Sequence, residues 1–191
     1  MRFTVLASLL MTLGVFCGCT APDPVVFSEA LQQKVDEKVY LKTNIWYTNP
    51  NAISCLNIQD GRFLPVGSEV EPVMTTDEGQ IIFKDTDGKV YTILFSEGET
   101  LSSMREYVKR VFTTTPPEEF FKNTDANALA RIRRGEVVAG MNRQDVLFAY
   151  GYPPAVRTPD LRNESWIYWI GGNRTIRVVF RGDTVTKVVE F

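Results

Sequence analysis

The chain has 191 residues and a formal net charge of −2, and 44% of its residues are hydrophobic while 23% are charged. These values are typical of a folded soluble body and argue against a nucleic-acid-binding protein, which needs a clustered basic surface. The sequence contains no histidine, which excludes His-based acid–base catalysis, Ser–His and Cys–His nucleophile pairs, and most zinc sites. No pair of carboxylates stands in a recognisable catalytic setting. We therefore expect no enzyme, no cofactor, no metal site and no small-molecule substrate.

The N-terminal segment 1–18 is predicted to be a signal peptide. Arg2 precedes an apolar run at 3–16, which is shorter than the roughly 18–20 residues that cross a bilayer. The run ends in Phe16-Cys17-Gly18-Cys19, which resembles the lipobox of bacterial lipoproteins. This resemblance implies that Cys19, which follows the small Gly18, is the lipidation site. An ordinary signal peptide with incidental cysteines is the alternative.

Residues 19–27 would then form the lipidated tether, kept extended by two prolines in the sequence Ala21-Pro22-Asp23-Pro24. Thr20 stands where an aspartate would signal retention in the inner membrane, so the resemblance implies an anchor in the cell outer membrane, with the protein facing the periplasm. Cys55 is left without a partner in the chain, and we expect a buried structural thiol there rather than a reactive one.

Residues 28–39 are predicted to form an amphipathic helix, because Ser28 is an N-cap residue and Leu31, Val35 and Val39 recur at four-residue spacing. Residues 40–112 are predicted to form a β-rich module with a closing helix at 98–112. Apolar alternation and turn residues predict its strands at 41–47, 52–58, 63–72, 80–84 and 89–95.

The segment Pro65-Val66-Gly67-Ser68-Glu69-Val70 resembles a turn of bacterial SH3-like barrels, which implies a small barrel for this module. Asp85-Thr86-Asp87-Gly88 lacks the spacing of a calcium loop and is predicted to be a hairpin turn. Trp46 and Tyr47 either line a sugar or peptide groove or pack in the core, and we favour the core.

Two adjacent prolines, Pro116 and Pro117, mark the start of a second module at 116–191. Asp125 is predicted to cap a helix at 126–134. This helix ends in three cations, which either form an anionic-partner site or only complement the helix dipole, and we favour the dipole. The three cations are Arg131, Arg133 and Arg134.

A capped helix follows between Asn142 and Gly151, with Asp145 completing the cap at its start. Alternating residues then predict strands at 164–170 and 174–181, and a two-residue loop at Gly182-Asp183 joins the second strand to a third. A regular hairpin would place Phe180 opposite Val185 and Ile176 opposite Val189. The whole chain is thus predicted to be α+β.

This second module is similar to the SmpA/OmlA (BamE-like) outer-membrane lipoprotein domain family over about residues 125–191. The resemblance rests on the segment Gly135-Glu136-Val137-Val138-Ala139-Gly140-Met141, a capped helix, Tyr150-Gly151-Tyr152-Pro153, a Trp166-x-Tyr168 strand, and Val178-Val179-Phe180 before a hairpin. It implies a two-helix, three-stranded antiparallel meander.

The same resemblance implies a non-catalytic scaffold that is anchored to the outer membrane and acts in cell-envelope or β-barrel protein assembly or maintenance. Its partners would be envelope proteins, among them β-barrel assembly components. The alternatives are a periplasmic binding module for peptidoglycan or peptide and an inhibitor of a secreted enzyme.

Overall fold

The computed structural model describes residues 26–171 and 174–191, which form an α+β fold with two hydrophobic cores. The predicted signal peptide 1–18, the lipidation site Cys19 and tether residues 19–25 lie outside the described residues. Within the described ranges, no helix has both the length and the apolar character that a membrane span requires.

The helices are α1 (Phe27–Leu31), α2 (Glu97–Thr100), α3 (Met104–Val111), α4 (Pro117–Phe120), α5 (Ala126–Ile132) and α6 (Arg143–Tyr150). The strands are β1 (Val39–Leu41), β2 (Ile45–Tyr47), β3 (Ile53–Ser54), β4 (Arg62–Leu64), β5 (Glu69–Thr75), β6 (Gln80–Asp85), β7 (Val90–Leu94), β8 (Phe112–Thr113), β9 (Ser165–Ile170), β10 (Arg174–Arg181) and β11 (Thr184–Glu190).

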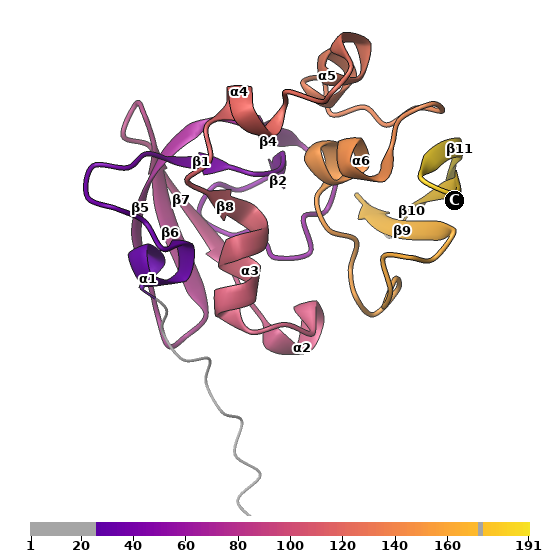
Figure 1. Cartoon of the computed structure of the whole chain (residues 1–191). Helices are drawn as coiled ribbons and strands as arrows, with labels where there is room; N and C mark the ends of the chain where they lie inside the picture. Colours follow the sequence, from indigo (N-terminus) through magenta and orange to yellow (C-terminus); the bar gives the residue numbers. More distant parts are fainter. Residues whose placement is uncertain (1–25, 172–173) are drawn as a thin grey trace, which may run out of the picture.

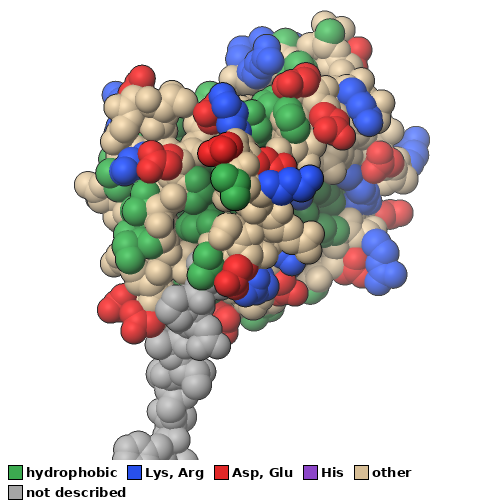
Figure 2. Space-filling view, turned by 60° about the vertical axis from the view of Figure 1, so that its left-hand side comes forward, with side chains coloured by type: hydrophobic (Ala, Val, Ile, Leu, Met, Phe, Trp, Pro, Cys, Tyr) green, Lys and Arg blue, Asp and Glu red, His purple; other side chains and the backbone are tan. Residues whose placement is uncertain are grey.

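The N-terminal module is built on a six-stranded sheet in the order β3-β7-β6-β5-β1-β8, beside a separate two-stranded sheet of β2 and β4. Alternation along β6 and β7 turns Ile81, Phe83, Tyr91 and Ile93 into the first core, where α1 and α3 also pack. Figure 1 shows this module on one side of the molecule and α6 between it and the β9–β11 sheet. On the face drawn in Figure 2, acidic and basic side chains are interspersed, so neither sign of charge covers a large area.

The predicted helix 28–39 is wrong in length. Helix α1 begins at Phe27, with Val26 rather than Ser28 at the N-cap position, and stops at Leu31 because Gln32 adopts a left-handed conformation with φ +53°. Val35 is 91% exposed and does not extend an apolar face. The periodic apolar spacing therefore overstated this helix.

The closing helix predicted at 98–112 is in fact two helices, α2 and α3. Leu101 has φ +50° and is 61% exposed, and it separates them. Helix α3 begins afresh at a capping box in which the Ser103 hydroxyl accepts from the Glu106 backbone and the Glu106 carboxylate accepts from the Ser103 backbone.

Two predicted strands are also interrupted. The strand expected at 41–47 is β1 and β2, which belong to different sheets, and residues 42–44 between them are not extended. The strand expected at 63–72 is β4 and β5, separated by a turn in which Ser68 donates to the Pro65 carbonyl. Only Ile53–Ser54 is strand in the predicted 52–58.

The C-terminal module carries α4, α5 and α6 and an antiparallel sheet in the order β11-β10-β9. Its core contains Trp166, Tyr168 and Phe180, and it also takes in Val66 from the N-terminal module. The capping box predicted for α6 is confirmed, since Asn142 and Asp145 each accept from the other's backbone N–H at 2.9 Å. Gly151 ends the helix, as predicted, with a positive φ of +78°, but its ψ of −167° lies outside the left-handed helical conformation expected at such a stop.

The hairpin register differs from the regular one. Phe180 does lie opposite Val185, but a bulge at Thr186 places Ile176 opposite Glu190 rather than Val189. The Thr186 hydroxyl donates to the Val179 carbonyl at 3.2 Å. Because Thr186 is left out of the ladder, Val188 rather than Lys187 lies opposite the buried Val178.

Candidate functional site

The carboxyl end of helix α6 is the point where the two modules join. The last four carbonyls of any helix lack partners within the helix and need donors from elsewhere. Here residues of the N-terminal module supply donors to each of the last four residues of α6. Thr43 Oγ1 donates to the Leu147 carbonyl at 2.7 Å, and the Asn44 backbone N–H donates to the Phe148 carbonyl at 2.9 Å.

The next two carbonyls are bound by side-chain amides. Asn44 Nδ2 donates to the Ala149 carbonyl at 3.1 Å, and Asn57 Nδ2 donates to the Tyr150 carbonyl at 2.9 Å. Gln59 Nε2 adds a second bond to Tyr150 at 3.2 Å. The N-terminal module thus acts as the C-cap of a helix that belongs to the other module.

Asn44 is fully buried, and all of its polar groups have partners. Its Nδ2 also donates to the Ile132 carbonyl at 2.8 Å, its Oδ1 accepts from Val66 N–H at 2.8 Å, and its carbonyl accepts from Asn57 Nδ2 at 2.9 Å. Asn44 is thus a fully paired member of this buried network, whereas Gln59 Oε1 at its edge is buried without a partner among the described residues. These contacts explain why residues 42–44 leave the sheet between β1 and β2.

Gly151 fits tightly into this junction. A Cβ atom at this position would lie 2.7 Å from Asn57 Nδ2 and 3.2 Å from Thr43 Oγ1, and the positive φ already disfavours other residues. Its carbonyl accepts from the Tyr168 hydroxyl at 3.0 Å. The absence of a side chain at Gly151 therefore lets the end of α6 approach Thr43 and Asn57 of the first module while it stays bonded to Tyr168 of its own module.

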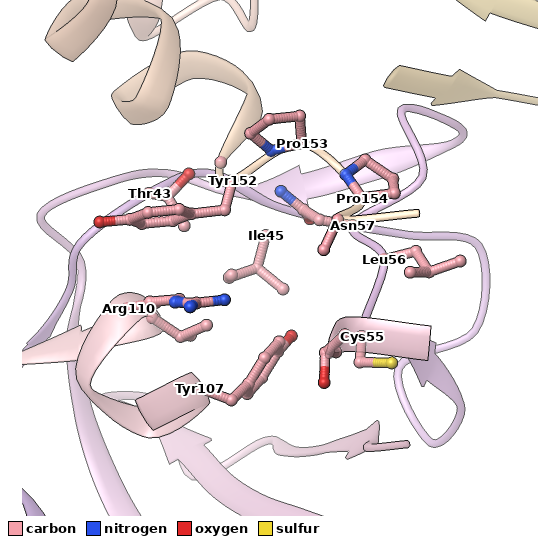
Figure 3. Close-up of a pocket in the computed structure, with 14 residues that line it drawn as sticks. Thr43, Ile45, Cys55, Leu56, Asn57, Tyr107, Arg110, Tyr152, Pro153 and Pro154 are labelled. Atoms are coloured by element: carbon pink, nitrogen blue, oxygen red, sulfur yellow. The ribbon is translucent and has the colours of Figure 1, made fainter. Parts of the chain in front are cut away.

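A cavity of about 40 Å³ lies beside this junction, and both modules contribute to its wall. Figure 3 shows the cavity between α3, the segment after β3 and the segment after α6. Its fourteen lining residues are Thr43, Ile45, Cys55, Leu56, Asn57, Thr100, Tyr107, Arg110, Val111, Gly151, Tyr152, Pro153, Pro154 and Ala155. We take this cavity as the candidate functional site and call it the seam cavity.

Two polar side chains of α3 project into the seam cavity (Figure 3). Tyr107 is 7% exposed, and burial raises the pKa of its hydroxyl well above the usual value. Arg110, one turn further along the same face, is half-buried, with its guanidinium 5.2 Å from the centre of the Tyr152 ring. A guanidinium over an aromatic face is held in place while its N–H groups remain free to bind.

Cys55 lies in the wall of this cavity as a free, buried thiol, as the sequence predicted. Burial is the main reason that its pKa is raised to about 12. Its Sγ donates to Glu99 Oε2 at 3.5 Å. Since only the thiolate is a good nucleophile, the raised pKa disfavours reaction of this cysteine at neutral pH.

The aromatic pair Trp46 and Tyr47 packs in the structure rather than lining a groove. Trp46 lies 4.6 Å from Phe63, ring centre to ring centre, and approaches the backbone of Gly135. Tyr47 packs edge-on against Tyr91 at 5.6 Å. Tyr47 is partly buried against the first core, as predicted, whereas the half-buried Trp46 belongs to neither core and packs on Phe63 between the modules.

The other sequence candidates also have structural roles. The Asp85 carboxylate accepts from the backbone N–H of Asp87 and Lys89, as a hairpin turn requires. Arg131 and Arg134 both pair with Glu136, at 2.7 and 3.0 Å, which reduces their use as an anion site. Across residues 26–171 and 174–191, no group of three or more Cys, Asp or Glu side chains could hold a metal ion.

The sequence did not single out Tyr107 or Arg110 as site residues. Arg110 stands among other polar residues in the predicted closing helix at 98–112, and Tyr107 belongs to no motif. Helix α3 begins afresh at the capping box of Ser103, and its residues Tyr107 and Arg110 line the seam cavity together with residues of the second module. That second wall could not be foreseen from local sequence.

In comparisons with known proteins, no protein family, curated protein or solved structure matches the chain.

Proposed function

We propose that this protein is a lipoprotein anchored in the outer membrane, facing the periplasm, and that it acts as a non-catalytic scaffold in cell-envelope or β-barrel protein assembly. The observation that carries the proposal is the junction at the end of α6, where donors from one module bind four consecutive carbonyls of the other. Such a junction fixes the two modules relative to each other, and a scaffold needs a fixed spacing between the surfaces it presents to its partners.

The leader and the second module support the same proposal. The sequence Phe16-Cys17-Gly18-Cys19 resembles a lipobox, and α5 and α6 followed by the antiparallel β9–β11 sheet is the arrangement that the SmpA/OmlA (BamE-like) resemblance implies. For the first module, the turn after Pro65 is the feature that favours an SH3-like arrangement, whereas its six-stranded sheet has β3 and β8 at its edges and does not close into a barrel.

Metabolic labelling with a palmitate analogue tests the anchor. We expect label in the wild type and in Cys17→Ala, and no label in Cys19→Ala. Label that persists in Cys19→Ala, or that is absent from the wild type, contradicts the anchor. Cys17→Ala is the matched control, because it removes a neighbouring cysteine and leaves Gly18-Cys19 intact.

Gene deletion tests the role in the envelope. We expect higher outer-membrane permeability and lower levels of β-barrel proteins, both restored by the wild-type gene. An unchanged barrier together with unchanged barrel-protein levels would count against the scaffold function.

A periplasmic binding module for peptidoglycan or peptide is the second candidate, and the seam cavity favours it. Because both modules line the cavity, the binding site would need the whole chain rather than the β-rich module alone. Retention of the full-length protein on purified cell-wall sacculi would support peptidoglycan as the ligand, and its absence would exclude it.

A further inference from the structure

We propose that the seam cavity binds a carboxylate group next to a small apolar group, as at the C-terminal end of a peptide, with Arg110 and Tyr107 as its donors. This inference deepens the second candidate function. It does not depend on the lipid anchor, because binding is measured on the purified protein.

The charge of the cavity wall is the first argument. Arg110 is the one charged residue among the fourteen that line the cavity. Within the described part of the chain, no carboxylate lies within 4 Å of its guanidinium and no hydrogen bond engages it. A half-buried cation without an acidic partner favours an anionic ligand, since a charge removed from water needs a counter-charge or hydrogen bonds.

The Tyr107 hydroxyl is the second argument. The side chain is more than nine-tenths buried and points into the cavity (Figure 3), and its hydroxyl has no hydrogen-bond partner among the residues that the structure describes. Since burial holds its pKa well above the usual value, the group keeps its proton and can donate. The hydroxyl oxygen itself remains accessible from the cavity, so a carboxylate oxygen that enters the cavity would supply its missing partner.

The size of the cavity is the third argument. A volume of about 40 Å³ corresponds to about three water-sized groups, at roughly 10–15 Å³ each. A carboxylate has three heavy atoms and is planar, which suits a guanidinium that donates through two parallel N–H groups. A tetrahedral phosphate is larger. The remaining wall is apolar, with Ile45, Leu56, Val111 and Pro153 beside the polar pair, and it suits a methyl group better than a second charge.

Acidic groups near the seam cavity do not cancel the positive charge that Arg110 gives it. Glu99 contacts the wall residue Cys55 but does not line the cavity, and its carboxylate accepts from the Cys55 thiol at 3.5 Å. The Cys55 thiol itself is neutral at physiological pH because its pKa is about 12. The nearest charge to an entering ligand is therefore that of Arg110.

The test is calorimetric titration of the full-length protein, purified in detergent, with acetyl-alanyl-alanine and with the same peptide carrying a C-terminal amide. We expect the free acid to bind and the amide to bind at least ten-fold more weakly. Equal affinity for the two peptides, or no binding of either, overturns the proposal. Since this comparison uses the wild-type protein, a variant that fails to fold cannot obscure it.

Titration with acetate, and separately with inorganic phosphate, identifies the source and shape of the anion. If acetate binds as tightly as the peptide, the natural ligand is a free short carboxylic acid. If the peptide binds more tightly, the ligand is the C-terminal carboxylate of a peptide. Both results support a carboxylate site. Phosphate binding more tightly than either carboxylate contradicts it.

Variants of α3 assign the donors. We expect Arg110→Gln to weaken binding of the free acid at least ten-fold, Arg110→Lys to keep part of it, and Tyr107→Phe to weaken it several-fold. Arg105→Gln is the matched control, because Arg105 lies on the same helix, is exposed, and pairs with Glu29 at 3.7 Å instead of facing the cavity. Unchanged affinity in a folded Arg110→Gln variant overturns the proposal.

The experiments on the anchor, the scaffold function and the seam cavity are independent, so a negative result in one does not decide the others. Loss of peptide binding leaves the anchor and the scaffold function standing, and unlabelled Cys19 leaves the seam cavity standing. A protein that binds the peptide but is not retained on sacculi has a carboxylate site without peptidoglycan as its ligand.

Discussion

The side-chain amide of Asn57 donates a hydrogen bond of 2.9 Å to the carbonyl of Tyr150, the last residue of α6 and 93 positions away in the sequence. This bond and its neighbours leave no carbonyl at the end of α6 without a partner. Since a buried unpaired carbonyl is costly, separating the modules would expose or orphan these groups. We therefore expect the two modules to unfold in one transition although each has its own core.

Substitution of Asn44 tests this junction most directly. Asn44→Ala removes donors from the carbonyls of Ile132 and Ala149 and an acceptor from the N–H of Val66. At about 1–3 kcal/mol for each buried group left unsatisfied, we expect the free energy of unfolding to fall by about 3 kcal/mol. Urea unfolding followed by circular dichroism measures it.

Asn51→Ala is the matched control for this experiment. Asn51 is an exposed turn residue in the same module, and we expect its substitution to change stability by less than about 0.5 kcal/mol. A similarly small effect of Asn44→Ala would show that the junction contributes little to stability.

Gly151→Ala tests the close approach at the end of α6. A Cβ atom would meet Asn57 Nδ2 at 2.7 Å in addition to the positive φ, whereas at Gly140, with φ +93°, no atom lies within 4 Å. We expect a loss of about 1 kcal/mol for Gly140→Ala from backbone strain alone and about 3 kcal/mol for Gly151→Ala. Thermal unfolding measures both losses of stability. Equal losses for the two variants would mean that Asn57 moves away from the added Cβ atom at no cost in free energy.

The extent to which the sequence predicts this structure depends on how local each interaction is. The capping box of α6 joins Asn142 to Asp145, three residues apart, and it was predicted correctly. Thr43 instead binds Leu147, 104 positions away, so the break between β1 and β2 had no local signal. The seam cavity depends on the same distant contacts, and for that reason Tyr107 and Arg110 were not recognised.

The register of the β10–β11 hairpin was also only partly predictable from the sequence. A regular ladder would have turned Lys187 toward the buried Val178, a conflict visible in the sequence. The structure resolves it with the bulge at Thr186, after which Val188 lies opposite Val178 and Lys187 opposite Val179. A charged residue at an expected core position was thus the one local indication of a bulge.

Alanine substitution at two adjacent positions tests the bulge. Val188 packs against the second core and Lys187 is exposed. We expect Val188→Ala to lower the free energy of unfolding by about 1 kcal/mol and Lys187→Ala to change it by less than about 0.5 kcal/mol. The opposite order would indicate a regular ladder without the bulge.

The buried thiol of Cys55 gives a prediction on reactivity and pH. In a full-length Cys17→Ser, Cys19→Ser variant, Cys55 is the single cysteine left of the three in the sequence. With its pKa raised to about 12 against about 8.5 in an unfolded chain, we expect Ellman's reagent at pH 8 to react about a thousand-fold more slowly in the native protein than in urea. A native rate equal to the unfolded rate would contradict the burial of this group.

The raised pKa of the Cys55 thiol also determines how the stability of the protein changes with pH. Because the unfolded thiol ionises first, the folded state loses stability as the pH rises from about 8.5 toward about 12, and below that window Cys55 has no effect. Cys55→Ala should remove this part of the alkaline decline. Glu99→Gln should leave the thiol protected, since burial contributes more to the shift than the contact with Glu99 does. Fast native labelling in Glu99→Gln would instead assign the protection to that carboxylate.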